Sequence, residues 1–468
     1  MEQKTLLKDK AFLKQLLFLA LPLALQNLIN SSLQLADTVM VGMLGQDSLS
    51  AVSLANTPFF VLMFFGFGLQ SGGAVLISQY WGKRDITTIN RVFGISVMGA
   101  VAVSLIVSTV IFIFPTQVMS VITDNPALVD IAARYSRMVA FSYVFNSFTV
   151  IYIGMHRSTE NPRFGMILLF VSMFMNIFLN YTFIFGKFGA PAMGVEGAAF
   201  ATLLSRIIEV CIVIVHMFVS KHIKLNLKAI FRPGMVIFRD YVKYATPVVI
   251  NEVLWSLGVS LYPVIFGHMR DSSDIVAAYS ISGNIERIVG VFSFAIAGSA
   301  AIMVGKAIGA GETKERVYKM GLTLNILSAL TGVVTGLILL TLTEAVIAPV
   351  VYPIFNLTAN ATKASTTMLF IIAFFLPARY FTTTNVVGVW RGGGDVKSGM
   401  YLDTGTIYLY AVPLAAIAAL VLKLDIIWVY LLISSEEIIK AALGVWRFRS
   451  KKWIQNITRD MPEVASET

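Results

Sequence analysis

The stretch that decides the fold is residues 15–43, QLLFLALPLALQNLINSSLQLADTVMVGM, in which Asp37 is the only charged side chain. A bilayer has a hydrocarbon core about 30 Å thick, which an α-helix crosses with about 20 apolar residues. The apolar run also exceeds the ~7–15 residues of a signal-peptide core, and no small-residue cleavage site follows it. We therefore expect a membrane helix that is not cleaved off.

Further apolar stretches of similar length follow along the chain. Together they predict an all-α polytopic membrane protein with twelve transmembrane helices. The predicted spans are 15–43, 51–79, 93–114, 133–155, 164–186, 195–219, 243–267, 275–304, 320–343, 366–389, 400–422 and 426–446.

The composition excludes several other classes of protein. Of the 468 residues, 57% are apolar and 13% are charged, whereas soluble domains carry about 25% charged residues. One cysteine excludes an internal disulfide, and the four scattered histidines show no Cys/His zinc spacing. We expect no cofactor and no metal beyond a possible Na⁺. In a membrane protein, a net charge of +10 usually reflects the Lys and Arg of the cytoplasmic segments and does not indicate nucleic-acid binding.

The positive charges predict the orientation. If the N-terminus is cytoplasmic, 26 of the 36 lysines and arginines fall on the inner side, at most six fall outside, and four lie within spans. Cytoplasmic segments carry the excess of Lys and Arg. We therefore expect a multi-pass plasma (inner) membrane protein with both termini in the cytoplasm. Its parts are an amphipathic N-terminus, an N-lobe, a basic linker, a C-lobe and a tail, at 1–14, 15–219, 220–242, 243–446 and 447–468.

Short motifs recur at a slowly growing offset. The pairs are Ala20-Leu21-Pro22 with Ala245-Thr246-Pro247, Gly82 with Gly309, and Arg157 with Arg391, at offsets of 225, 227 and 234 residues. Six spans separate the members of each pair, and an even number preserves orientation. We therefore expect two six-helix lobes that are parallel repeats about an axis along the membrane normal. Chance matches among Gly- and Ala-rich helices are the alternative.

Two such lobes would enclose a cleft, and rocking of the lobes gives alternating access in secondary transporters. The sequence holds no Walker-type loop, GxxxxGK[ST]. Transport would therefore be driven by an ion gradient or by the gradient of the substrate.

Polar side chains gather on one face of the first span. Asn27, Asn30 and Gln34 precede Asp37 at spacings of three or four residues, which places them on the same helix face. An ionisable residue within a span is a functional candidate. We expect these residues to line the cleft, and Pro22 to kink the helix. The alternative is an interfacial aspartate near a helix end.

Two amides stack on one face of the fifth span. Asn176 and Asn180 are four residues apart, and amide oxygens can bind Na⁺ or a protonated carboxyl. They could instead join helices by hydrogen bonds. Thr202 lies in a small-residue segment that permits close helix approach.

The second lobe has its own buried acid. Glu252 lies nine residues past Lys243, about 13 Å into the membrane, and Asn251 precedes it. Glu286 and Asp403 are weaker candidates that could be paired structurally. Two ion pairs are expected from helical spacing. Arg206 should pair with Glu209, and Lys440 should pair with Glu436 or Glu437.

Several motifs together resemble one family. They are Gln26-Asn27 with Asp37-Thr38-Val39-Met40-Val41-Gly42, Gln79-Tyr80-Trp81-Gly82, Asn176-Ile177-Phe178-Leu179-Asn180, Gly194-Val195-Glu196-Gly197-Ala198-Ala199 and Asn251-Glu252-Val253. Over nearly the whole chain, the sequence resembles the multidrug and toxic compound extrusion (MATE) transporters. The resemblance implies a two-lobed exporter of organic cations coupled to inward H⁺ or Na⁺.

The resemblance also implies roles for single residues. Asp37 matches the N-lobe acid that binds the coupling cation, and Asn176, Asn180 and Thr202 match its companions. Some members have an aspartate at the position of Asn180, and the amide lowers the local negative charge. This departure favours H⁺ over Na⁺.

Glu252 matches the C-lobe glutamate of one subgroup, so Glu252, Asn251 and Glu286 are candidates for a second ion or substrate site. The acidic partner of that subgroup in span ten is absent, because the chain reads Arg379-Tyr380-Phe381 there. Tyr380 is instead a candidate to line the cleft, and Arg379 is a candidate partner of Glu252.

The expected mechanism is competition for the Asp37 cavity. The acid takes up a proton from outside and releases it inside, and its protonation lowers the affinity for an organic cation. The expected partners are small organic cations and the bilayer, with no nucleic acid and no obligate protein partner.

One rival function is a lipid-linked precursor flippase, which usually lines its cleft with several cations. A membrane enzyme is the other, although the chain holds no HExxH or GxSxG motif. We expect no catalytic residue.

Overall fold

The computed structural model describes residues 5–355 and 357–460, and every regular element in these ranges is a helix. The first half of the chain forms the N-lobe. Its helices are α1 (Lys10–Gly42), α2 (Gln46–Ala55), α3 (Thr57–Lys83), α4 (Ile86–Ile113), α5 (Pro115–Ile122), α6 (Pro126–Val139), α7 (Ser142–Ser158), α8 (Pro162–Phe185) and α9 (Gly194–Val219).

The second half forms the C-lobe, which follows the one-turn helix α10 (Leu227–Phe231). Four of its segments are π-helical and are labelled η. The C-lobe consists of α11 (Met235–Gly267), α12 (Ser272–Gly309), α13 (Lys314–Leu342), η1 (Thr343–Val351), α14 (Tyr352–Ile354), α15 (Ala359–Thr383), η2 (Thr384–Trp390), α16 (Val396–Thr406), η3 (Ile407–Ala411), α17 (Val412–Ala416), η4 (Ile417–Val421), α18 (Ile426–Ser434) and α19 (Glu436–Arg449).

Each of the twelve predicted spans coincides with helical structure. Ten segments of the described chain are long and apolar enough to cross a membrane, and the pair α6–α7, bent by 52°, is an eleventh if it counts as one span. The predicted span 426–446 corresponds to α18 and α19, which only Ser435 separates. The predicted all-α, two-lobed membrane fold is confirmed.

The helices extend beyond the predicted boundaries at two places. α1 begins at Lys10, because the Asp9 carboxylate accepts hydrogen bonds from the first-turn N–H groups and caps the helix. Residues 10–14 are therefore helical and continuous with the first predicted span, and residues 1–4 lie outside the described ranges. α11 begins at Met235, so the last part of the predicted linker, residues 235–242, is helical and continuous with the seventh predicted span.

Reciprocal contacts between the lobes reveal the repeat. A Cβ added at Gly82 would collide with the carbonyl of Lys306, and a Cβ added at Gly309 would collide with the carbonyl of Gln79. Gln79 and Lys306 are 227 residues apart, as are Gly82 and Gly309. Such exchanged contacts are expected of two halves related by a two-fold axis. The parallel repeat predicted from the sequence is confirmed.

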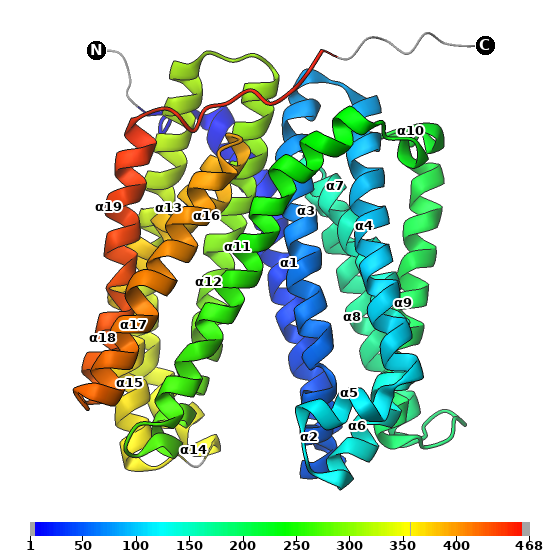
Figure 1. The fold of residues 1–468 in the computed structure, drawn as a ribbon, viewed down its shortest axis with the longest axis vertical. Helices are drawn as coiled ribbons and strands as arrows, with labels where there is room; N and C mark the ends of the chain where they lie inside the picture. The colour runs from blue at the N-terminus through cyan, green and yellow to red at the C-terminus, as the bar shows by residue number, and fades with distance from the viewer. Residues whose placement is uncertain (1–4, 356, 461–468) are drawn as a thin grey trace.

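The lobes meet through α3 packed along α11 and α1 packed along α12. Figure 1 shows that the described chain begins and ends at the same end of the molecule, which we call the terminal end. The helices of the two lobes diverge toward the opposite end, where α2, α5, α6 and α14 lie.

The predicted kink at Pro22 does not interrupt α1. Pro22 is buried inside the helix, which continues from Lys10 to Gly42, and its repeat counterpart Pro247 is buried in the equally long α11. Each proline lacks one backbone donor, so each helix has a weakened turn at the same level of its lobe.

Candidate functional site

A cavity of about 670 Å³ lies within the N-lobe, between α1, α3, α7, α8 and α9. Its α1 wall is polar. Asn27, Asn30, Gln34 and Asp37 all line it, as their spacing along the helix predicts. The acid is therefore on the wall of an internal cavity and not on the lipid-facing side of α1.

An amide of α8 holds the acid in place. Asn180 Nδ2 donates to Asp37 Oδ1 over 2.6 Å and to Asn176 Oδ1 over 3.0 Å. Both amide side chains are buried, whereas Asp37 is half-buried, and Thr202 lines the same cavity from α9. The Oδ1 atom of Asn180 is buried without a hydrogen-bond partner among the described residues. The structure thus gathers the four residues that were predicted for the N-lobe ion site.

The cavity also holds charges that the sequence analysis did not assign to it. Arg206 Nη1 lies 2.6 Å from Glu209 Oε2, which confirms the predicted ion pair, and both residues line the cavity. Ser172 donates to the same carboxylate over 3.3 Å. Arg157 lies in α7, just beyond the predicted span 133–155, and lines the cavity as well. The sequence analysis used Arg157 only as the repeat counterpart of Arg391.

Apolar and aromatic side chains form another part of the cavity wall. They come mainly from α3, with Tyr135 from α6, and include Phe59, Phe60, Met63, Phe67 and Tyr135. Aromatic faces attract organic cations, and methionine adapts to different shapes. The cavity therefore combines an acid and amides with a surface that suits large apolar molecules.

In the C-lobe, Glu252 is bound by an arginine that also contacts the N-lobe. Arg391 Nη2 lies 2.6 Å from Glu252 Oε1, and Arg391 Nη1 donates to Ser71 Oγ of α3 over 2.9 Å. Arg379 pairs with Glu286 instead, so the expected pairing of Arg379 with Glu252 is wrong. Because Arg391 already neutralises Glu252, the acid is a structural link between the lobes in this conformation.

A second buried cluster in the C-lobe surrounds Lys440. Its Nζ lies 3.3 Å from Asp403 Oδ1 and 3.4 Å from Glu436 Oε1, which confirms the predicted pairing with Glu436. Asn251 Nδ2 donates to Asp403 Oδ2 over 3.4 Å. Asn251 therefore belongs to this cluster and not with its neighbour Glu252, and the three candidates for the second-lobe site are divided among separate ion-pair groups.

Tyr380 does not line the cavity, contrary to expectation. Its side chain is fully buried in the C-lobe core, and its hydroxyl donates to the carbonyl of Val289 over 2.6 Å. Because the hydroxyl already has a partner in the packed interior, the ring contributes to packing rather than to a binding surface.

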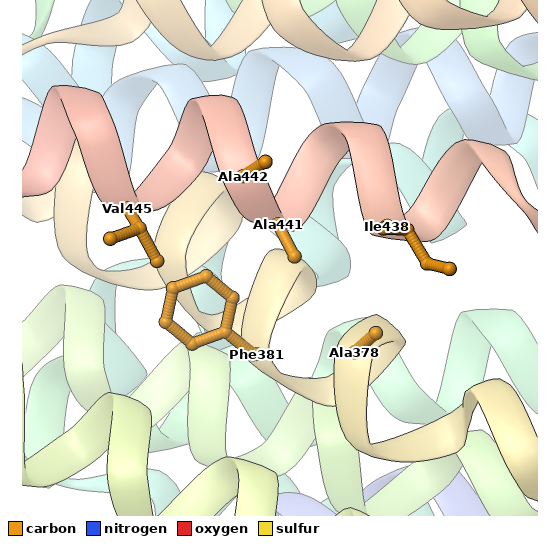
Figure 2. A pocket seen from close by; sticks show the side chains of 6 residues that line it. All are labelled: Ala378, Phe381, Ile438, Ala441, Ala442 and Val445. Carbon is orange, nitrogen blue, oxygen red and sulfur yellow. The ribbon is translucent and has the colours of Figure 1, made fainter.

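A shallow, open pocket of about 370 Å³ lies between α15 and α19 (Figure 2). Its lining is wholly apolar and consists of Ala378, Phe381, Ile438, Ala441, Ala442 and Val445. It offers no group that could bind an ion, so we do not include it in the candidate site. Within the described ranges, no group of three or more His, Cys, Asp or Glu side chains is arranged to hold a metal ion.

An ion pair closes the seam between the lobes at the terminal end. Lys306 Nζ lies 2.7 Å from Glu160 Oε2, and Glu160 also accepts hydrogen bonds from Trp81 and Gln15. Burial alone would raise the pKa of the Glu160 carboxyl. The hydrogen bonds from Lys306, Trp81 and Gln15, with the charge of Lys306, outweigh burial and lower that pKa below its ordinary value of 4.5.

The C-terminal tail crosses the same seam. Gln79 of α3 donates to the carbonyls of Gly392 and Gln455 over 3.0 and 3.1 Å, and accepts from the N–H of Ile457 over 3.0 Å. Trp453 is fully buried within the C-lobe core. The tail therefore fixes the C-lobe to α3 of the N-lobe, an arrangement that the sequence analysis missed.

One family accounts for both halves of the chain. The MatE family model matches residues 22–182 and again residues 247–417, which repeats the offset of 225 residues. The chain is 26% identical over 443 residues to a probable multidrug resistance protein NorM of Thermotoga maritima, covering 94% of this chain and 93% of that relative. It is also 26% identical to a probable multidrug resistance protein YoeA of Bacillus subtilis, over 65% and 66% of the two chains.

Solved structures share the fold. An outward-facing conformation of a multidrug resistance MATE family transporter of the MOP superfamily superposes with a TM-score of 0.84 at 20% identity, covering 94% of this chain and 96% of that one. A MOP superfamily transporter from Pyrococcus furiosus superposes with a TM-score of 0.83 at 19% identity, covering 94% and 95%. At these identities the likeness shows the fold, while the family model covers more than half of the sequence. The chain belongs to the MatE family, the multidrug and toxic compound extrusion transporters.

Proposed function

We propose that this protein is a secondary active exporter of organic, mostly cationic compounds, driven by the inward movement of H⁺ or Na⁺. The observation that carries the proposal is Asp37, an acid bound by Asn180 on the wall of a cavity of about 670 Å³ with aromatic residues on another wall. A carboxylate beside aromatic rings suits an apolar cation. Relatives described as multidrug resistance proteins support the same function.

A proton on Asp37 would change the contact between α1 and α8. Asn180 now presents its Nδ2 to Asp37, which suits an ionised carboxylate that can only accept. A protonated Asp37 becomes a donor, and Asn180 would turn its unpartnered Oδ1 toward the new O–H. That turn removes Nδ2 from Asn176. Protonation thus both removes the charge that attracts a cation and rearranges a link between two helices.

The same geometry favours H⁺ over Na⁺ as the coupling ion. Nδ2 of Asn180 is a hydrogen-bond donor and lies between the oxygens of Asp37 and Asn176, where a cation bound by both oxygens would sit. A hard cation needs several oxygen ligands. An aspartate at position 180 would supply them, whereas the asparagine supplies a donor.

We further propose that the terminal end faces the cytoplasm of a cell whose plasma membrane holds the protein. The excess of Lys and Arg on that side supports this orientation. Asp37 lies five residues before the end of α1 at Gly42, about 8 Å from the opposite end of the helix. With the terminal end closed, the cavity would then be accessible from outside, and Asp37 would load from the exterior.

Dye efflux from proteoliposomes tests this function. Vesicles loaded with a fluorescent cationic dye receive either a pH gradient or a Na⁺ gradient, each imposed alone. We expect the pH gradient to drive dye movement against its own gradient, and the Na⁺ gradient to have little effect. Dye movement that neither gradient alters would overturn the proposed coupling.

The flippase alternative is not favoured by the charges of the cavity. A pyrophosphate-bearing substrate needs several free cations, but Glu209 neutralises Arg206. Among the described residues lining the cavity, Arg157 is the one arginine without an ion-pair partner.

A further inference from the structure

The linker between the lobes carries unbalanced positive charge. Residues 221–239 contain five cations and no acid: Lys221, Lys224, Lys228, Arg232 and Arg239. None of the five forms an ion pair with a described residue, and Lys228 and Arg232 are exposed. The first acid after them, Asp240, is buried and bound on both oxygens by Arg459 over 2.6 and 2.8 Å. The charge of the linker is therefore available to an external anion.

The linker is docked on α4 in a fixed position. Asn90 Nδ2 donates to the carbonyl of Lys224 over 3.1 Å, and Asn90 Oδ1 accepts from the N–H of Asn226 over 3.2 Å. A Cβ added at Gly94 would collide with the backbone of Ile230, so the glycine permits α10 to lie directly against α4. The charges are thus presented by a built surface and not by a loose loop.

The depth of this surface matches the edge of the bilayer. Gly94 lies eight residues past the start of α4 at Ile86, about 12 Å along the helix. The apolar part of α4 begins at Phe93, immediately beside this contact. Figure 1 shows α10 beside the outer helices α4 and α9 near the terminal end. α10 therefore lies beside the point where the apolar run of α4 begins, which is the level expected for the boundary between headgroups and acyl chains.

The residues of α10 divide into faces that suit this position. Ala229 and Ile230 are buried against the protein. Leu227 and Phe231, four residues apart, are 58% and 69% exposed. Lys228 is also exposed, as is Arg232, which follows the last residue of α10 and donates its N–H to the Lys228 carbonyl over 3.0 Å. An apolar edge thus lies beside a cationic edge, which is the pattern of an interfacial segment.

We propose that the α10 surface binds an anionic glycerophospholipid, whose phosphate contacts Lys228 and Arg232 and whose acyl chains lie against Leu227 and Phe231. Clustered Lys and Arg beside a membrane helix attract anionic headgroups, and apolar side chains at the same level hold the chains. The site is separate from the transport cavity and does not depend on the transported compound or on the coupling ion.

Lipid retention measured by native mass spectrometry tests this site. The purified protein is incubated with phosphatidylglycerol or with phosphatidylcholine of the same chains, and the retained lipids are counted. We expect the double variant K228Q/R232Q to lose phosphatidylglycerol selectively, by roughly fivefold for each charge removed. The matched control K187Q/K423Q also removes two positive charges, but from exposed loops away from the linker. It should retain the lipid. Equal losses in both double variants would overturn a specific site.

The variant Phe231→Ser distinguishes a lipid from a free anion. The substitution leaves the net charge unchanged. Because the Phe231 ring is exposed, the variant should have the same melting temperature as the wild type in phosphatidylcholine. We expect it to weaken phosphatidylglycerol retention, and we expect inorganic phosphate at millimolar concentration not to displace the lipid. Unchanged retention in Phe231→Ser together with displacement by phosphate would identify a simple anion site and overturn the proposal.

Discussion

Arg459 and Asp240 are joined by two hydrogen bonds although 219 residues separate them in sequence. Nε and Nη2 of the arginine donate to the two carboxylate oxygens over 2.6 and 2.8 Å. The backbone N–H of Arg459 also donates to the Tyr80 hydroxyl, and Lys83 donates to the Arg459 carbonyl. The last described residues of the chain therefore bind α3 of the N-lobe and the first turns of α11 in the C-lobe at once.

Removing this pair should favour opening of the terminal end. Arg459→Gln leaves Asp240 buried without its partner and loosens the tail residue whose backbone binds Tyr80. Because the arginine is exposed, we expect a modest shift toward the conformation in which the terminal end is open. Spin labels at Arg84 and Lys314, on opposite lobes in a Cys211→Ser background, would report a larger fraction of long distances. Lys452→Gln is the control, because this lysine is exposed in the same tail. Identical distance distributions in the two variants would contradict the role of the tail.

Gly309→Ala should have a similar but stronger effect. Its Cβ would collide with the Gln79 carbonyl across the seam, and overpacking of this kind costs about 1–3 kcal/mol. We expect the same spin labels to show the terminal end held apart. Gly290→Ala lies on the same helix with open space around it, so it should behave like the wild type. A closed seam in Gly309→Ala would mean that the lobes can approach each other differently.

Asp37→Asn should abolish coupled efflux while the protein still folds. The asparagine oxygen can still accept from Asn180, so we expect a melting temperature within a few degrees of the wild type. Proteoliposome efflux under a pH gradient would fall to background, because the side chain cannot exchange a proton. Asp47→Asn, which neutralises an exposed acid at the start of α2, should leave efflux intact. Normal efflux by Asp37→Asn would remove the acid from the mechanism.

Asn180→Asp should make efflux depend on Na⁺. The substitution places a second carboxylate within contact of Asp37 and replaces the donor Nδ2 by an oxygen ligand. We expect a Na⁺ gradient to drive dye movement in this variant and not in the wild type. Asn30→Asp adds the same charge elsewhere on the cavity wall and should not produce Na⁺ dependence. If both variants respond equally to Na⁺, charge alone and not geometry selects the ion.

Acid should weaken the seam through Glu160. Its pKa is lowered in the folded protein, so its stabilising effect is complete above the ordinary value of 4.5 and is lost as the pH falls through the lower folded value. At pH 7 we expect Glu160→Gln to melt below the wild type, and we expect this difference to shrink toward pH 4. Glu344→Gln changes an exposed acid and should melt like the wild type throughout. A constant difference between wild type and Glu160→Gln at all pH values would contradict the assignment.

The sequence predicted those features that depend on local patterns. The apolar stretches located the membrane helices because each span must satisfy its own backbone hydrogen bonds. The spacing of Asn27, Asn30 and Gln34 placed them on one face with Asp37 because helical periodicity is a local property. The ion pair of Arg206 with Glu209 followed from the same periodicity.

Contacts between distant segments could not be predicted in this way. Arg391 lies 139 residues from Glu252, and no local rule favours it over Arg379, which lies at a similar separation. Tyr380 is buried in the core because the carbonyl of Val289 is near enough to accept a hydrogen bond from its hydroxyl. The sequence does not show that these two residues are close together. The position of the C-terminal tail depends on hydrogen bonds to the Gln79 side chain. That amide meets its partners in the C-lobe and in the tail only when both lobes have assembled.

Arg157 and Arg391 are repeat counterparts, yet one lines the cavity and the other is enclosed between Glu252 and Ser71. The duplicated halves therefore kept one architecture while the surroundings of their acids diverged. Among the described acids proposed for the two lobes, Glu252, Glu286 and Asp403 each pair with a cation, whereas Asp37 is bound by an amide. Under the proposed mechanism, Asp37 carries one ion in each cycle. Swapping that ion for a monovalent organic cation moves no net charge, so under the proposed mechanism the cycle is electroneutral and membrane voltage alone would not power it.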